Sequence, residues 1–121
     1  AKDEERLSEL TPREFEQWGI VLYFYLIGDL AWMLGRQAVT MRKWESEGIL
    51  PMTPITKELG EGFGALRLYT RGMILGTVQI AREEGILIPY SGDPKRTNFT
   101  ARVAELFASE AAAVQKMGKA A

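Results

Sequence analysis

The order of apolar and polar residues predicts a mostly helical chain that begins with a charged segment. Residues 1–10 are mainly charged, and we expect them to form a flexible arm. A helix-start signal follows, made by Thr11, Pro12 and Glu14: a capping hydroxyl, a proline suited to the first helical position and the acid of a capping box. Residues 11–26 are therefore predicted to form an N-terminal helix that packs on the core.

The apolar residues of this predicted helix recur at helical spacing. They are Phe15, Trp18, Val21 and Leu22. This pattern assigns Trp18 to the core face of the helix. Near residues 23–27, β-branched and aromatic residues could form a short strand instead, so the pattern leaves the end of the helix open.

Two shorter helices with a tight turn between them come next. Residues 28–34 place Leu30, Ala31 and Leu34 on one side, and Gly35 suits the left-handed residue of a turn. A second helix is predicted from Arg36 to about residue 47, ending at Gly48. Two helices joined in this way are typical of a helix-turn-helix, whose second helix enters the major groove of DNA.

The remaining pattern predicts a hairpin and two more helices. Residues 52–66 are rich in glycine and proline and read as a loop or hairpin, with a returning strand at 66–69. Thr70 can cap a helix that ends at Gly85, and residues 86–89 form a short extended apolar piece. A linker is expected over 90–97, followed by a C-terminal helix over 98–118, a candidate dimerisation element whose apolar stripe is too broken for a stable coiled coil.

The helix over 36–47 has a distinct outward side when drawn at 100° per residue. Ala38 and Met41 fall on the side that meets Leu34, and Arg42 and Trp44 lie on the flanks. The opposite side carries Arg36, Val39, Thr40 and Lys43. Such a set offers hydrogen-bond donors and positive charge, which phosphates and base edges require. The same composition also fits an ordinary solvated helix face.

Composition narrows the function classes. The 121-residue chain has 46% hydrophobic and 26% charged residues, which suits one globular domain. It has neither cysteine nor histidine, so disulfides, the usual zinc sites and the commonest general base are absent. We therefore expect no enzyme, no cofactor and no metal, and the lack of cysteine is compatible with the cytoplasm. The longest apolar run, residues 19–28, is too short to span a membrane.

The net charge of −1 is unevenly distributed. Residues 1–35 contain three basic and seven acidic residues, whereas residues 36–96 contain nine basic and seven acidic ones. Local patches decide DNA binding more than the total charge does. The central segment is thus the better candidate, although its small excess predicts modest nonspecific affinity.

Several segments of this central region resemble the MerR-type winged helix-turn-helix family, which extends to phage excisionases and the DNA-binding domains of phage small terminase subunits. The segments that carry the resemblance are Ile27–Ala31, Gly35, Thr40–Glu45, Glu47–Pro51, Arg67–Thr70 and Ala81–Gly85. They are similar, in order, to the family's IGELA motif, turn glycine, TLRYYE motif, EGLLP motif, wing-closing R-x-Y-T strand and following helix end. The resemblance covers residues 25–86 and implies a MerR-like winged helix-turn-helix over 27–89, mainly α with a small β wing.

The resemblance also implies binding roles. Arg42 would hold a phosphate, Thr40 and Lys43 would sit at the groove, and Tyr69 would brace the wing or touch the backbone, with Arg67 and Arg71 as further phosphate contacts. The full set of candidate DNA-binding residues is Arg36, Gln37, Val39, Thr40, Arg42, Lys43, Lys57, Arg67, Tyr69 and Arg71. Trp44 matches a fold-supporting position, whereas Trp32 is expected to be partly exposed.

The chain departs from the family pattern at three places. Lys43 replaces an aromatic residue, and Val39 can meet a thymine methyl but cannot donate to a base. The segment between Pro51 and Arg67 is longer than a typical wing, and Lys57 is its one basic residue. This extension could follow the minor groove, bind another protein or be a mobile loop.

The sequence thus predicts a double-stranded DNA-binding protein, either a transcriptional regulator or an excisionase-like architectural factor, with a homodimer as a candidate assembly because one module makes few base contacts. Two alternatives stay open. One is a DNA-packaging component similar to a small terminase subunit, and the other is a protein-interaction module that has lost DNA binding.

Overall fold

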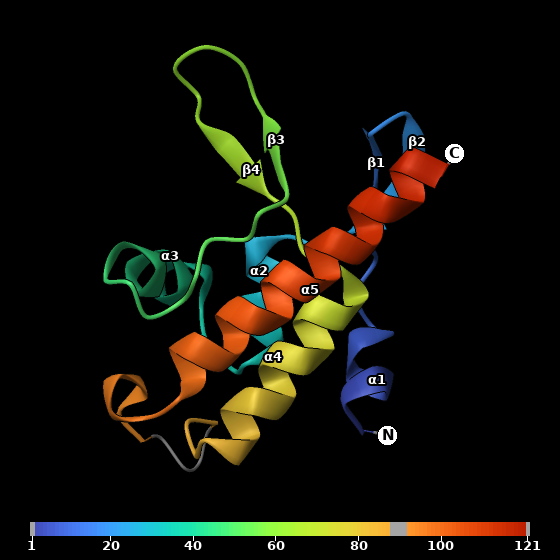
Figure 1. The fold of residues 1–121 in the computed structure, drawn as a ribbon. Coiled ribbons are helices and arrows are strands. Elements are labelled where there is room, and N and C mark those ends of the chain that lie inside the picture. The colour runs from blue at the N-terminus through green and yellow to red at the C-terminus, as the bar shows by residue number, and fades with distance from the viewer. Residues whose placement is uncertain (1, 88–91, 121) are drawn as a thin grey trace.

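Helices build most of the fold, and each of its two small sheets is an antiparallel hairpin (Figure 1). The computed structural model describes residues 2–87 and 92–120, with the side chains of 119 and 120 left aside. The elements in chain order are α1 (Lys2–Leu7), β1 (Arg13–Gln17), β2 (Ile20–Phe24), α2 (Ile27–Met33), α3 (Ala38–Ser46), β3 (Thr56–Glu58), β4 (Ala65–Arg67), α4 (Arg71–Glu83), the 3₁₀ turn η1 (Pro94–Arg96) and α5 (Phe99–Ala120). The prediction of a mainly helical chain with a small β component is confirmed in this coarse form.

The N-terminal region differs from the sequence prediction. The predicted helix over 11–26 is wrong, because β1 and β2 form a hairpin with five register pairs, from Arg13 opposite Phe24 to Gln17 opposite Ile20. A two-residue turn joins the strands, with positive φ at both Trp18 (52°) and Gly19 (78°). The strand form places every second side chain toward the core, where Phe24 is buried and Phe15 and Leu22 pack against it.

Two further N-terminal predictions are wrong. Residues 2–7 form α1 rather than a flexible arm: Leu7 is fully buried and Asp3 pairs with Arg82 of α4 at 2.7 Å. Trp18 is not in a helix and not in the core, because it occupies the hairpin turn and is 39% exposed. The same exposure for Trp32 agrees with its expected partial exposure.

The central helices lie where the sequence predicts them. Gly35 has φ 69° in the turn between α2 and α3, and Leu30, Leu34 and Met41 are buried between the two helices. The Thr70 hydroxyl accepts a hydrogen bond from the Met73 amide at 3.0 Å and so caps α4, as predicted.

The long helix α5 packs against α4 inside the same chain (Figure 1). Gly72 and Gly76 of α4 allow this approach, because a Cβ at either glycine would collide with Glu110 or Leu106 of α5. The apolar stripe of α5 is buried by this packing: Phe99, Val103, Phe107 and Ala111. The stripe is therefore covered without a second subunit, and dimerisation through the rest of α5 stays a prediction.

Part of the predicted domain boundary cannot be placed. The proposed change from domain to linker at residues 89 and 90 lies outside the described residues, while η1 falls in the remainder of the predicted linker. Over the described ranges, each helix is too short or too polar to traverse a bilayer.

Candidate nucleic-acid interface

The outward side of α3 is a polar surface whose direction is set by the buried side of the helix. Met41 and Trp44 are buried, and they fix which side of α3 faces the protein. Val39 (63% exposed), Arg42 and Lys43 then point to solvent. Gln37, exposed, precedes the helix, and Thr40 is half-buried at its first turn. These side chains therefore lie on the side of α3 that is turned away from the core, where an α-helix can present them to a major groove.

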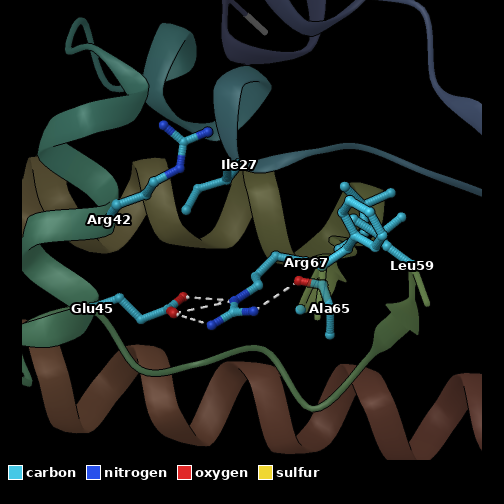
Figure 2. Close-up of a pocket in the computed structure, with 9 residues that line it drawn as sticks. Ile27, Arg42, Glu45, Leu59, Ala65 and Arg67 are labelled. Atoms are coloured by element: carbon cyan, nitrogen blue, oxygen red, sulfur yellow. Dashed lines mark hydrogen bonds and ion pairs between the residues drawn. The ribbon is translucent and has the colours of Figure 1, made fainter. Parts of the chain in front are cut away.

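Arg42 lines an open pocket of about 480 Å³ between α3 and the β3–β4 hairpin (Figure 2). Ile27 and the Arg67–Glu45 pair also line it, together with Leu59 and Phe63 from the loop of the hairpin. Within the described residues, neither Arg42 nor Lys43 takes part in an ion pair. Their charges therefore remain available to an anionic partner.

The β3–β4 hairpin extends from the body of the molecule beside this pocket (Figure 1). It has three register pairs, and exposed Lys57 stands opposite Leu66, which lines the pocket. Its loop is ordered by two backbone bonds, in which the Leu59 amide donates to Gly64 and the Phe63 amide to Gly60, at 3.1 and 3.2 Å. Lys57 therefore joins Arg42 and Lys43 as an exposed cation on this side of the chain.

Arg67, expected to contact phosphate, serves the protein's own structure. Its guanidinium donates to Glu45 of α3, with the shortest contact at 2.6 Å, and to the Ala65 carbonyl at 2.8 Å. The Glu45 hydrogen bond raises the pKa of Arg67 above its usual value. The pair ties β4 to α3. Because Glu45 neutralises the charge of Arg67, this side chain has little charge left to attract DNA.

Arg36 is also redirected toward the protein, contrary to its predicted place on the outward side. It donates to the Ile86 carbonyl at 2.8 Å and to the Leu34 carbonyl at 3.3 Å, and it lies 4.9 Å from the centre of the Trp44 ring. Burial lowers its pKa by removing water from the charged group. Arg36 thus holds the α2–α3 turn against the chain that follows α4.

The contact of Tyr69 with DNA is excluded, because its side chain is 0% exposed and stacks edge-on against Phe107. Burial raises the pKa of Tyr69 well above its ordinary value. Its other predicted role, bracing the hairpin, fits the backbone bridge between Tyr69 and Tyr25.

Arg71 is exposed but faces α1, where it lies 3.6 Å from Glu4. The Glu4 carboxylate partly offsets the charge of Arg71, and the pair is directed toward α1 rather than toward α3.

Sequence reasoning missed the features that complete this site. Glu45 was part of a matched motif, yet nothing in its spacing identified Arg67 as its partner, since 22 residues separate them. Leu59 and Phe63 were overlooked because an apolar residue in a glycine-rich loop has no periodic context. Their signal was composition alone: two large apolar side chains in a loop of six exposed residues.

The interface offers cations and hydrogen-bond donors. Over the ranges that the structure describes, no three acidic side chains gather closely enough to hold a metal ion. Compared with known proteins, the chain matches no family model, no curated protein and no solved structure. Any function must therefore be argued from this geometry.

Proposed function

We propose that this protein binds double-stranded DNA as a winged helix-turn-helix, with α3 in the major groove and the β3–β4 hairpin as the wing beside the backbone. The observation that carries the proposal is the outward side of α3, where Arg42 and Lys43 are exposed and unpaired within the described residues while Met41 and Trp44 anchor the helix beneath them. Regulation of transcription and excisionase-like shaping of DNA are the roles that this kind of contact supports.

The number of free cations sets the expected strength of binding. Arg36, Arg67 and Arg71 are engaged within the protein, so Arg42, Lys43 and Lys57 remain as phosphate contacts. Each neutralised phosphate contributes about −0.9 to the slope of log affinity against log salt, so three contacts give about −3. Such a slope corresponds to modest affinity, which two copies on neighbouring half-sites would raise.

Base selectivity is expected to be narrow. Val39 reaches solvent at the start of α3, where it can pack on a thymine methyl, while Thr40 and Gln37 supply the polar contacts nearby. A single such module distinguishes few base pairs, because each mismatch costs only about 1–3 kcal/mol.

Titration of labelled duplex at several salt concentrations tests the proposal. The wild-type slope should be about −3, and Arg42→Ala with Lys43→Ala should reduce it by about two while leaving the melting temperature nearly unchanged. The matched control is Lys95→Ala with Arg96→Ala, which removes the same charge from exposed positions on η1. Equal losses in both double variants, or a wild-type slope near zero, would reject DNA binding by α3.

A further inference from the structure

The N-terminal hairpin has one face that no other part of the described chain covers. In its register, Glu14 stands opposite Tyr23 and Glu16 opposite Val21, and all four side chains are exposed. We call these four residues the outer face. Val21 is 54% and Tyr23 62% exposed, so two large apolar side chains lie in a row along β2 beside a row of two carboxylates along β1.

The hairpin behind this face is firmly attached to the protein. On its inner side Phe24 is buried and packs against Phe15, with ring centres 6.2 Å apart. At its turn, Trp18 lies so close to α5 that a Cβ on Gly118 would come within 2.6 Å of the Trp18 Cβ. Beyond its end, Tyr25 exchanges backbone hydrogen bonds with Tyr69 at 2.8 and 2.9 Å. The outer face is thus a preformed surface that needs little ordering on binding.

We propose that the outer face is the docking surface for a partner protein, through a segment that carries apolar residues along one line and lysine or arginine beside them. Tyrosine is enriched in protein interfaces because it offers a large apolar body with a polar tip. Neither Glu14 nor Glu16 takes part in an ion pair within the described residues. A basic partner supplies the charge that this surface lacks.

A second copy of the chain fits this surface poorly. Two outer faces related by a two-fold axis would bury four carboxylates with no cations of their own between them, which is costly. The β1 strands of two copies could also pair edge to edge in antiparallel fashion, with the two Phe15 residues opposite each other. Glu14 of one copy would then stand opposite Glu16 of the other, where like charges repel. Charge complementarity therefore favours a different, basic protein.

The outer face lies on a different side of the protein from the α3 residues of the proposed DNA contact (Figure 1). In Figure 1, β1 and β2 stand on the opposite side of the helices from α3. A partner docked there leaves Arg42 and Lys43 accessible, so the protein can hold DNA and a second protein together. The docking site does not depend on the DNA-binding proposal, because the two surfaces share no residue.

The test uses the full chain and a synthetic helical peptide with leucines along one side and lysines flanking them. Isothermal titration gives the affinity, and NMR amide shifts give the location. Binding should perturb residues 14–23, and Val21→Thr with Tyr23→Thr should weaken it at least about tenfold, as for the central residues of an interface. Threonine keeps the strand propensity, so melting curves should show a folded variant.

Matched variants remove the same chemistry elsewhere. Met52→Thr with Leu59→Thr, which changes two apolar residues of similar exposure, should leave peptide affinity unchanged. Glu14→Gln with Glu16→Gln should lower affinity about threefold and flatten its salt dependence, whereas Glu47→Gln with Glu105→Gln should do neither. A peptide with glutamate in place of lysine should not bind.

Several results would overturn the docking site. These are no binding of the lysine peptide, amide shifts centred away from residues 14–23, or equal weakening by the Met52 and Leu59 control. A wild-type dimer in light scattering that Val21→Thr with Tyr23→Thr converts to monomer would identify a second copy as the occupant, and so reject a basic partner. Peptide affinity measured with saturating duplex should be unchanged, and a failure of duplex to bind would count against the DNA proposal alone.

Discussion

The two hairpins of this protein share a topology and differ in how they are attached to the core. The β1–β2 hairpin has five register pairs, a two-residue turn and a phenylalanine, Phe24, that is 1% exposed. The β3–β4 hairpin has three register pairs and a six-residue loop whose phenylalanine, Phe63, is 78% exposed. One hairpin packs one of its faces against the core, and the other is held mainly at its base.

This difference suggests separate uses for the two hairpins. The β1–β2 hairpin offers a fixed surface, which we call the platform, and the β3–β4 hairpin extends toward a ligand, so we call it the reaching hairpin. The Arg67–Glu45 pair fixes the base of β3–β4 to α3, so the direction of the hairpin is set while its tip stays free of packing. In β1–β2, by contrast, the inner face packs against the core, with Phe24 buried and Phe15 and Leu22 half-buried, and the outer face is exposed. A tip can adjust to a nucleic acid, whereas a fixed face suits a partner of matching shape.

The largest expected effect contrasts the two phenylalanines. Phe24→Ala should lower the free energy of unfolding by about 3–5 kcal/mol, because it leaves a cavity in the core. Phe63→Ala should change it by no more than about 0.5 kcal/mol, because the side chain is already in water. Urea denaturation followed by circular dichroism measures both. Similar losses in the two variants would show that the loop of β3–β4 is packed and that the contrast is mistaken.

The same contrast explains what could be predicted from sequence. The helices α2, α3 and α4 carry agreeing local signals: apolar periodicity, a turn glycine at Gly35 and a capping threonine at Thr70. In residues 13–24 the signals conflict, because Phe15, Leu22 and Phe24 fit a strand with alternating faces while Thr11 and Pro12 indicate a helix start. Tertiary burial decided the outcome, and local propensity cannot anticipate it.

The exposure of candidate site residues could be predicted where it follows from their position around a helix. Arg42 and Lys43 are exposed because Met41 and Trp44 are buried beside them. Arg36 and Arg67 were misplaced because their partners, the Ile86 carbonyl and Glu45, are distant in sequence. A cation's availability depends on such long-range pairing, which the spacing of charges along the chain does not reveal.

An intermediate effect is expected at the side-chain contacts that tie each hairpin to its neighbours. Arg67→Ala should cost about 1–2 kcal/mol of stability, because it leaves the largely buried Glu45 carboxylate without its partner. Gln17→Ala should cost no more than about 0.5 kcal/mol, since the Gln17 amide reaches the Thr56 carbonyl only at 3.5 Å. Chemical denaturation measures both losses.

The double variant Arg67→Ala with Glu45→Ala checks the cause of this loss. Removing both charges should be less costly than removing Arg67 alone, because no unpaired carboxylate remains. Arg67→Ala should also leave the salt slope of duplex binding near its wild-type value. A slope reduced by about one would instead assign a phosphate contact to Arg67.

The smallest expected effect concerns one exposed cation on each hairpin. Lys57→Ala should reduce the magnitude of the salt slope by about one and weaken binding to all duplexes to a similar extent, because a phosphate contact carries no base information. Arg13→Ala removes the same charge from the β1–β2 hairpin, away from α3, and should leave the slope unchanged. Neither substitution should alter stability measurably, since both side chains are exposed. If Arg13 and Lys57 proved equivalent, duplex binding would reflect the overall charge rather than a defined surface, and the distinction between reaching hairpin and platform would lose its functional meaning.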